Sequence, residues 1–196
     1  MSTGKEQYTE ISDEELMKGI CNSDKDAFNE LYKRYNGRLL YYFYRMLGNS
    51  EEKAQDLLQD IFLKIIEKPH LFDVSRKFST WIFSIAHNMC KNEYRSRDVR
   101  KIVENKDNVE TLNNKVPCED IDLRIFTGEL YKELDKLSED QKTIFILRYR
   151  EGFKVKEISN IVKRPEGTVK SKLFYTIRIL SEKLKYYKSN LKDVSW

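Results

Sequence analysis

Basic side chains are concentrated in residues 163–185, a segment with seven lysines and arginines and only two acids. The net charge of the whole chain is +4, so the placement of charge is more informative than its total. Gly167 and Thr168 are predicted to open a helix, and helix starts bind phosphate through backbone N–H groups and the positive end of the helix dipole. Lys170 and Lys172 would flank the same phosphates. The segment therefore predicts a nucleic-acid interface.

Two helices joined by a turn would position these cations. Residues 155–162 place apolar side chains at helical spacing, and Pro165 ends this helix because the residue before a proline is disfavoured in the helical region. A second helix follows, with an apolar stripe formed by Val169, Leu173, Ile177, Leu180 and Leu184. Its opposite face carries Gly167, Ser171, Tyr175 and Arg178. This pattern suits a recognition helix in a major groove, and the alternative is an amphipathic helix with a solvated face.

A second candidate interface lies on the helix predicted over residues 78–97. Its buried stripe is expected to contain Ile82, Ile85, Ala86 and Met89. The opposite face carries His87, Lys91, Tyr94 and Arg95, with Asn88 beside them and Trp81 and Phe83 on the flanks. Interleaved rings and cations suit single-stranded nucleic acid, because bases stack on the rings while phosphates contact the cations. The alternative for Trp81 and Phe83 is a place in the core at a helix junction.

The composition favours an all-α protein without a metal site or cofactor. The 196 residues include three prolines and seven glycines, and several stretches show helical periodicity without the alternation of strands. Cys21, Cys90 and Cys118 are too scattered for a disulfide framework or a zinc site, and His70 and His87 lie at no ligand spacing from them. No apolar run is long enough for a signal core or a membrane span, so we expect a soluble, cytoplasmic protein.

The chain is predicted to form two small helical domains joined by a flexible acidic linker. Residues 1–23 would form a tail with a first short helix, and residues 24–100 the first domain. Residues 101–122 form the linker, since residues 102–122 lose helical periodicity and hold six acids against two lysines. The second domain would span residues 123–188, with the helix-turn-helix at about 154–178, followed by a tail at 189–196. Helix ends are predicted at Gly48 and before Pro69, and a capping box at Ser138.

Three segments of the first half carry motifs of a known family: DAFNELYKRY, EEKAQDLLQDIFLKI and KFSTWIFSIAHNMCKNEYRSR. They are similar to region 2 of bacterial RNA polymerase sigma factors of the extracytoplasmic-function class, within the sigma-70 family. In the second half, LSEDQKTIFILRYREGFKVKEISNIVKRPEGTVKSKL resembles region 4 of the same family. The resemblance implies a transcription initiation factor, not an enzyme. It would bind core RNA polymerase, melt promoter DNA at the minus-ten element and recognise the minus-thirty-five duplex.

The resemblance also implies a site for each partner. The clamp helices of the β′ subunit would bind the helix after Ser50, at Asp56, Leu57, Gln59, Asp60, Phe62 and Leu63, and the flap of the β subunit is a second polymerase contact. Leu71, Phe72 and Asp73 would shape a base pocket at the minus-ten element. The opened strand would run along Trp81, His87, Asn88, Lys91 and Arg95. An anti-sigma factor that covers these faces is a further implied partner.

The upstream duplex would be bound by the second helix of the helix-turn-helix. Base contacts are expected from Lys170, Ser171, Phe174 and Tyr175, and phosphate contacts from Arg164, Gly167, Thr168, Lys172 and Arg178. Lysine stands where the family often has arginine, which favours phosphate over bidentate guanine contacts. The chain also departs from the family at Gln55 (usually Glu), at Asn92 (usually Asp) and at Lys163, where the turn usually has a glycine.

Two other functional classes compete with this interpretation. A stand-alone transcriptional regulator would share the helix-turn-helix without needing polymerase. A nucleic-acid enzyme has little support, because the chain has no GxxxxGK loop, metal cluster or nucleophile motif. For the linker, mimicry of RNA phosphates in the polymerase channel and a solvated spacer are both compatible with the composition.

Overall fold

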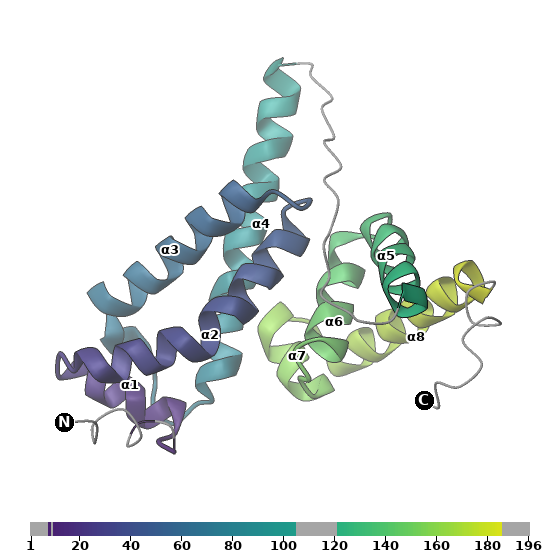
Figure 1. Cartoon of the computed structure of the whole chain (residues 1–196). Coiled ribbons are helices and arrows are strands. Elements are labelled where there is room, and N and C mark those ends of the chain that lie inside the picture. Colours follow the sequence, from purple (N-terminus) through teal and green to yellow (C-terminus); the bar gives the residue numbers. More distant parts are fainter. Residues whose placement is uncertain (1–7, 9, 105–120, 186–196) are drawn as a thin grey trace. The chain divides into compact units, whose positions relative to one another are not determined.

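The computed structural model describes residues 8, 10–104 and 121–185, and all regular secondary structure in these ranges is helical. The described helices form two compact units, an N-terminal one within residues 8–104 and a C-terminal one with most of residues 121–185 (Figure 1). The predicted all-α fold is therefore confirmed. Residues 105–120 of the predicted linker and the predicted tail at 189–196 lie outside the described residues. Over the described ranges, no helix combines the length and apolar content needed to cross a membrane.

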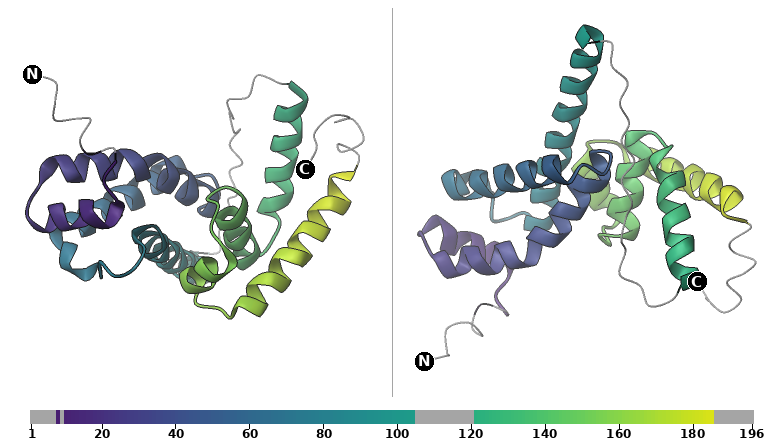
Figure 2. Two further views of the ribbon diagram at one scale, coloured as in Figure 1. Left: turned by 90° about the horizontal axis from the view of Figure 1, so that it is seen from below. Right: turned by 45° about the horizontal axis from the view of Figure 1, so that its top comes forward.

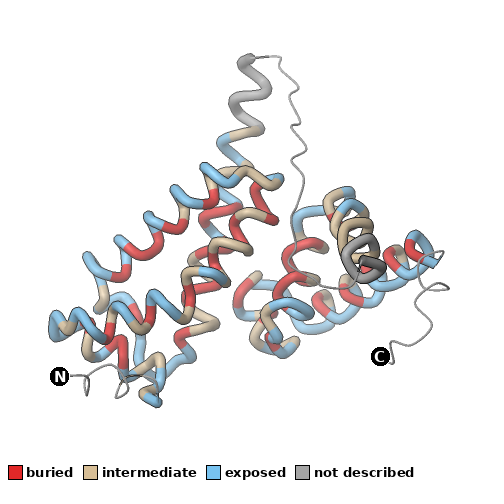
Figure 3. The backbone as a smooth tube through the Cα atoms, in the orientation of Figure 1, coloured by how far each residue is buried: buried red, intermediate tan, exposed pale blue. Residues whose placement is uncertain are grey.

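The N-terminal unit contains four α-helices and one short 3-10 turn. These are α1 (Asp13–Cys21), α2 (Lys25–Met46), α3 (Glu51–Glu67), η1 (Pro69–Leu71) and α4 (Phe78–Glu104). The α2 helix packs against α1, α3 and α4, and α3 also contacts α4 (Figure 2). Buried residues recur along α2, α3 and α4, so these helices share one core (Figure 3). The α4 helix continues beyond residue 100, into the segment predicted as linker.

Local signals explain where these helices begin and end. Asp24 caps α2, since its side chain accepts hydrogen bonds from two backbone N–H groups of the first turn. Gly48 and Asn49 have positive φ values of 72° and 64° in the turn after α2, which agrees with the predicted helix end. Ser50 is the N-cap residue of α3, although its side chain makes no capping hydrogen bond. The α3 helix ends just before Pro69, as predicted.

The α4 helix buries a wider arc than the single predicted stripe. Ile82, Ala86 and Met89 are buried as predicted, whereas Ile85 is half-buried. Phe83 is fully buried, so the interpretation of this ring as core is confirmed. The reason is that α4 lies against α1, α2 and α3, and contacts on several sides widen the buried surface of a helix.

The second half of the chain contains α5 (Ile121–Asp135), α6 (Glu139–Tyr149), α7 (Val155–Val162) and α8 (Glu166–Lys183). The α8 helix packs against α5 and α6. Ser138 caps α6, because its Oγ accepts a hydrogen bond from the Gln141 N–H at 3.4 Å. The predicted capping box is only half formed, since Gln141 Oε1 accepts from the Ser138 hydroxyl at 2.8 Å and not from its backbone N–H. Lys142 is 8% exposed and pairs with Asp135 at 2.8 Å, which ties α6 to the end of α5.

The turn between α7 and α8 contains Lys163 with a φ of 53°. This left-handed conformation costs a residue with a Cβ about 1–2 kcal/mol, which is the physical reason for the glycine that the family resemblance leads one to expect there. Beyond the turn, α8 buries Val169, Leu173, Thr176, Leu180 and Leu184. The prediction that Ile177 is buried was wrong, since its side chain is 40% exposed and Thr176 lies in the core instead. Residues 169, 173, 176 and 180 follow one helical stripe, and position 177 is rotated out of it.

Candidate nucleic-acid and polymerase interfaces

The N-terminal end of α8 is open to an incoming anion. Pro165 precedes the helix with φ −56° and ψ 146°, and no side chain caps the first turn. Gly167 is exposed, and a Cβ added at this position would meet no atom within 4 Å. The first amides of a helix have no acceptor within the helix, and the positive end of the dipole lies there. This helix start therefore has the features that bind phosphate.

The outer face of α8 presents the residues predicted to contact DNA. Gly167, Lys170, Ser171, Phe174, Tyr175 and Arg178 are all exposed. The Phe174 and Tyr175 side chains are 62% and 56% exposed, and their ring centroids lie 5.5 Å apart. Ser171 Oγ donates to the carbonyl of half-buried Thr168 at 3.0 Å, so its oxygen can still accept a hydrogen bond. Adjacent exposed rings among polar side chains are typical of a binding surface.

The loop between η1 and α4 is anchored by a buried ring. Phe72 is 5% exposed, and its ring centroid lies 5.4 Å from that of Phe78 and 5.1 Å from that of half-buried Trp81. The Phe72 ring packs inward, so it would shape the predicted base pocket by supporting the loop. Leu71 and Val74 are the exposed apolar side chains on either side of it, at 60% and 45%.

Asp73 fixes the turn of this loop. Its Oδ1 accepts hydrogen bonds from the Ser75 hydroxyl at 2.7 Å and the Ser75 N–H at 3.0 Å, and its Oδ2 lies 3.3 Å from Arg76 Nε. These contacts, chiefly the one from the Ser75 hydroxyl, hold the pKa of Asp73 below its ordinary value. Asp73 is therefore charged at neutral pH, and its carboxylate orders the loop.

One face of α4 presents polar and cationic side chains to solvent. Asn88, Lys91 and Arg95 are exposed, and their spacing of three and four residues places them on the same side of the helix. His87 does not join them. It is 7% exposed, and its Nδ1 lies 3.5 Å from the hydroxyl of Tyr42 in the core. The prediction of a DNA contact at His87 was wrong, because this side of α4 packs against α2.

The α3 helix presents acids beside apolar side chains. Asp56, Gln59, Asp60 and Leu63 are exposed, and Leu57 is half-buried. Phe62 is only 4% exposed, with its ring centroid 4.6 Å from that of Tyr32 and 6.0 Å from that of Phe28. Its predicted place on the docking face was therefore wrong. Ile66, which the sequence analysis did not single out, is 52% exposed like Leu63 and extends this face.

Two family models match separate parts of the chain. The model described as Sigma-70 region 2 matches residues 31–100, which lie in the N-terminal unit. The model described as Sigma-70, region 4 matches residues 127–175 of the second half. Together they cover more than half of the sequence. The chain belongs to the sigma-70 family. This sigma-70 factor is accordingly a transcription initiation factor, and a stand-alone regulator is not favoured.

Sequence relatives of this sigma-70 factor indicate its class. It is 27% identical over 166 residues to "ECF RNA polymerase sigma factor SigW" of Bacillus subtilis, which covers 80% of this chain and 88% of the relative. It is 26% identical over 184 residues to "ECF RNA polymerase sigma-E factor" of Haemophilus influenzae, covering 89% and 96%. The sigma-70 factor described here is thus of the extracytoplasmic-function (ECF) class.

Solved structures share the fold. The sigma factor RpoE from Bartonella quintana, determined in complex with the anti-sigma factor NepR, matches with a TM-score of 0.71 and 24% identity, covering 81% of this chain and 96% of that one. CnrH, determined in complex with the cytosolic domain of CnrY, matches with a TM-score of 0.66 and 20% identity, covering 90% and 99%.

An acid that the sequence analysis missed contacts two of the predicted phosphate ligands of this sigma-70 factor. Asp140 Oδ2 lies 3.2 Å from Lys172 Nζ and 3.6 Å from an Arg164 guanidinium nitrogen. Arg178 pairs with Glu182 at 3.4 Å. Asp140 lies in the first turn of α6, where an acid suits the helix dipole, so its position in the sequence gave no separate signal.

Proposed function

We propose that this sigma-70 factor docks on core RNA polymerase through α3, traps opened promoter DNA with the 70–77 loop and α4, and holds the upstream duplex with α8. The observation that carries the proposal is the match to both region 2 and region 4 in one chain, each in a part with an exposed polar or basic face. A factor with two DNA contacts can hold the duplex at one and open it at the other.

The polymerase contact is assigned to the exposed face of α3, formed by Asp56, Gln59, Asp60, Leu63 and Ile66, with Leu57 at its edge. Acids beside exposed apolar side chains complement a basic helical partner, because the apolar groups supply burial and the acids supply orientation. The clamp helices of the β′ subunit are the proposed partner. The flap of the β subunit is proposed as the second polymerase contact.

Opening of the minus-ten element is assigned to two exposed sets of residues in the N-terminal unit. Unstacking a base costs a few kcal/mol, and a pocket with aromatic stacking can return roughly 1–3 kcal/mol per base. Leu71 and Val74 are the exposed apolar groups of the loop, and Asn88, Lys91 and Arg95 would contact the strand beyond it. The protein would thus trap opened DNA without an energy source of its own, and we assign it no enzymatic activity and no cofactor.

Recognition of the minus-thirty-five element is assigned to the outer face of α8. Lys170, Ser171, Phe174 and Tyr175 would contact bases, while Arg164, Thr168, Lys172, Arg178 and the helix start at Gly167 would contact phosphates. Phosphate contacts position a protein on DNA, and base contacts specify the sequence. Lysines in place of arginines predict modest specificity, which the minus-ten contact has to complete.

An anti-sigma factor is proposed as a further partner, because the similar sigma factor RpoE was determined in complex with one. Such a partner would inhibit by covering the α3 face and the DNA-binding faces. We place the protein in the cytoplasm, with polymerase and DNA.

The test is complex formation between the purified chain and core RNA polymerase, followed by transcription from a promoter pool. Co-elution in gel filtration and selective transcription are expected. Phe174→Ala should still co-elute, because its exposed ring lies on α8 and not on the polymerase face. A wild-type chain that fails to co-elute would overturn the polymerase contact.

A further inference from the structure

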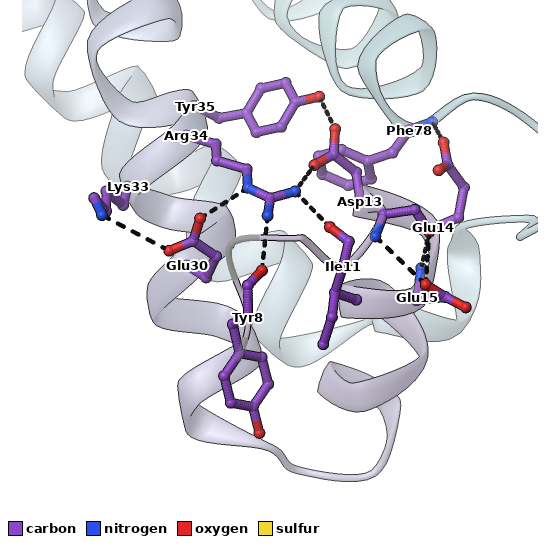
Figure 4. A network of polar contacts seen from close by, with 11 residues as sticks. Tyr8, Ile11, Asp13, Glu14, Glu15, Glu30, Lys33, Arg34, Tyr35 and Phe78 are labelled. Carbon is purple, nitrogen blue, oxygen red and sulfur yellow. Dashed lines mark hydrogen bonds and ion pairs between the residues drawn. The ribbon is translucent and has the colours of Figure 1, made fainter. Parts of the chain in front are cut away.

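A side chain of α1 contacts the first residue of α4. Glu14 Oε1 accepts a hydrogen bond from the backbone N–H of Phe78 at 2.8 Å (Figure 4). The two residues are 64 positions apart in the chain. The first amides of a helix have no acceptor within the helix, and a carboxylate at this end interacts favourably with the helix dipole. Glu14 therefore caps α4 from another helix.

The α1 helix that carries Glu14 is itself held firmly. The Arg34 guanidinium donates to Asp13 and to the backbone carbonyls of Tyr8 and Ile11, each at 2.8 Å, and the buried Tyr35 hydroxyl donates to the other oxygen of Asp13 (Figure 4). Leu16, Met17 and Ile20 of α1 are buried. Polar and apolar contacts together fix α1 on α2.

The residue that Glu14 holds supports the 70–77 loop. The Phe78 ring is fully buried, with its centroid 5.1 Å from that of Tyr35 and 5.4 Å from that of Phe72. Phe72 is the ring that anchors the loop, and α1 also contacts η1 directly. Leu71 and Val74, the exposed side chains of the loop, are thus separated from Glu14 by two packed rings.

We propose that Glu14 is a positioning residue for base recognition at the minus-ten element. It keeps the start of α4 and the Phe78–Phe72 pair in place, so that Leu71 and Val74 meet the unstacked base in one geometry. This inference rests on the proposed function of the loop. It assigns to α1, which carries none of the predicted DNA contacts, a role in sequence discrimination. Loss of the cap should lower discrimination at the opened bases and leave polymerase binding and the upstream contact unchanged.

The experiment uses holoenzyme assembled from the full chain and core polymerase. A pool of duplex DNA, randomised at the two promoter elements, is selected for open complexes and sequenced. Glu14→Ala should reduce the downstream base preference by about threefold to tenfold, the effect of one lost hydrogen bond, and leave the upstream preference intact. Glu14→Gln should retain most of the downstream base preference, because the amide oxygen can still accept the hydrogen bond from the Phe78 N–H.

Glu15→Ala is the matched control. Glu15 completes the capping box of α1 with Ser12, so its loss weakens α1 without touching Phe78. An equal loss of preference in Glu15→Ala and Glu14→Ala would overturn the proposal, since general loosening of α1 would then suffice. The proposal would also be overturned if Glu14→Ala left the downstream base preference unchanged. It would be overturned as well if Glu14→Gln lost as much of this preference as Glu14→Ala. A wild-type holoenzyme that selects no bases at the downstream element would instead refute the proposed function.

Discussion

The carboxylate of Asp140 lies between Lys172 and Arg164, at 3.2 Å from the ammonium and 3.6 Å from the guanidinium. Both cations are proposed phosphate ligands, so an internal anion lies beside them in the free chain. The Asp140 side chain is 37% exposed, and ion pairs of this kind contribute little free energy. An incoming phosphate can therefore displace it.

Asp140→Asn should raise the affinity for duplex DNA by about twofold to fivefold, equally on matched and scrambled upstream elements. Fluorescence anisotropy over a salt series measures this. The increase should vanish in an Arg164→Gln/Lys172→Met background if Asp140 acts through these cations. Glu129→Gln is the control, because it removes an acid that pairs with Lys132 on α5, and Lys132 is not a proposed ligand. The same increase in Glu129→Gln would show a general charge effect only.

Base-reading and phosphate-binding residues of α8 should respond differently to substitution. Lys170→Ala and Ser171→Ala should each lose about 1–3 kcal/mol of discrimination between matched and scrambled upstream elements, while Lys172→Ala weakens binding to both alike. Binding to the two duplexes at one salt concentration separates these outcomes. Equal losses on both duplexes for Lys170→Ala would contradict the assigned reading face.

The exposed face of α4 should matter for opening and little for duplex capture. An Asn88→Ala/Lys91→Ala/Arg95→Ala variant is expected to bind promoter duplex in holoenzyme yet lose permanganate-reactive thymines in the bubble. Lys18→Ala/Lys25→Ala, which removes two exposed cations from α1 and α2, serves as the charge control and should open normally. An intact bubble in the triple variant would count against the assignment.

Substitutions of two neighbouring apolar residues of α3 should have different effects, one on stability and the other on binding to polymerase. Phe62→Ala should lower the free energy of unfolding by about 3–5 kcal/mol, because a buried aromatic side chain is removed. Leu63→Ala should change stability by less than about 0.5 kcal/mol, because its side chain is 52% exposed, but it should weaken the complex with core polymerase. Thermal unfolding and gel filtration give the two readouts. A Leu63→Ala variant that unfolds early would place this residue in the core.

The left-handed turn at Lys163 predicts a stabilising substitution. Lys163→Gly should raise the free energy of unfolding by up to about 1 kcal/mol, because the strain of a Cβ at a φ of 53° exceeds the extra entropy of glycine in the unfolded chain. Urea denaturation measures this change in the free energy of unfolding. Lys163→Ala, which keeps the Cβ and removes only the charge, should give no gain.

Helix ends and the recognition face of α8 could be predicted from sequence because their causes are local. Ser138, Gly48 and Pro69 act on the backbone within a few residues, so their effects do not depend on the rest of the fold. The outward positions of Lys170 and Tyr175 likewise follow from the helical repeat alone. Where a helix packs against several elements, the burial of its side chains differed from the prediction.

The sequence predictions failed or were incomplete where a helix packs on more than one side, or where the residue that a side chain contacts is distant in the sequence. His87 was placed outside because one apolar stripe was assumed for α4, and Phe62 because the family resemblance implied it. Both α3 and α4 contact several elements, which bury these side chains. Phe72 lies in a loop without periodicity, so only Phe78 and Trp81 could reveal that its ring is buried. Asp140 and Glu14 act across elements, and no spacing in the sequence predicts such contacts.

All helices of the N-terminal unit, from α1 to α4, lie within residues 13–104. Domains fold as units during synthesis, and at about 5–20 residues per second the rest of the chain takes on the order of ten seconds to emerge from the ribosome. The cap from Glu14 to Phe78 can thus form on a nascent chain. For those seconds, the growing polypeptide would carry the proposed polymerase-docking face without the unit that holds upstream DNA.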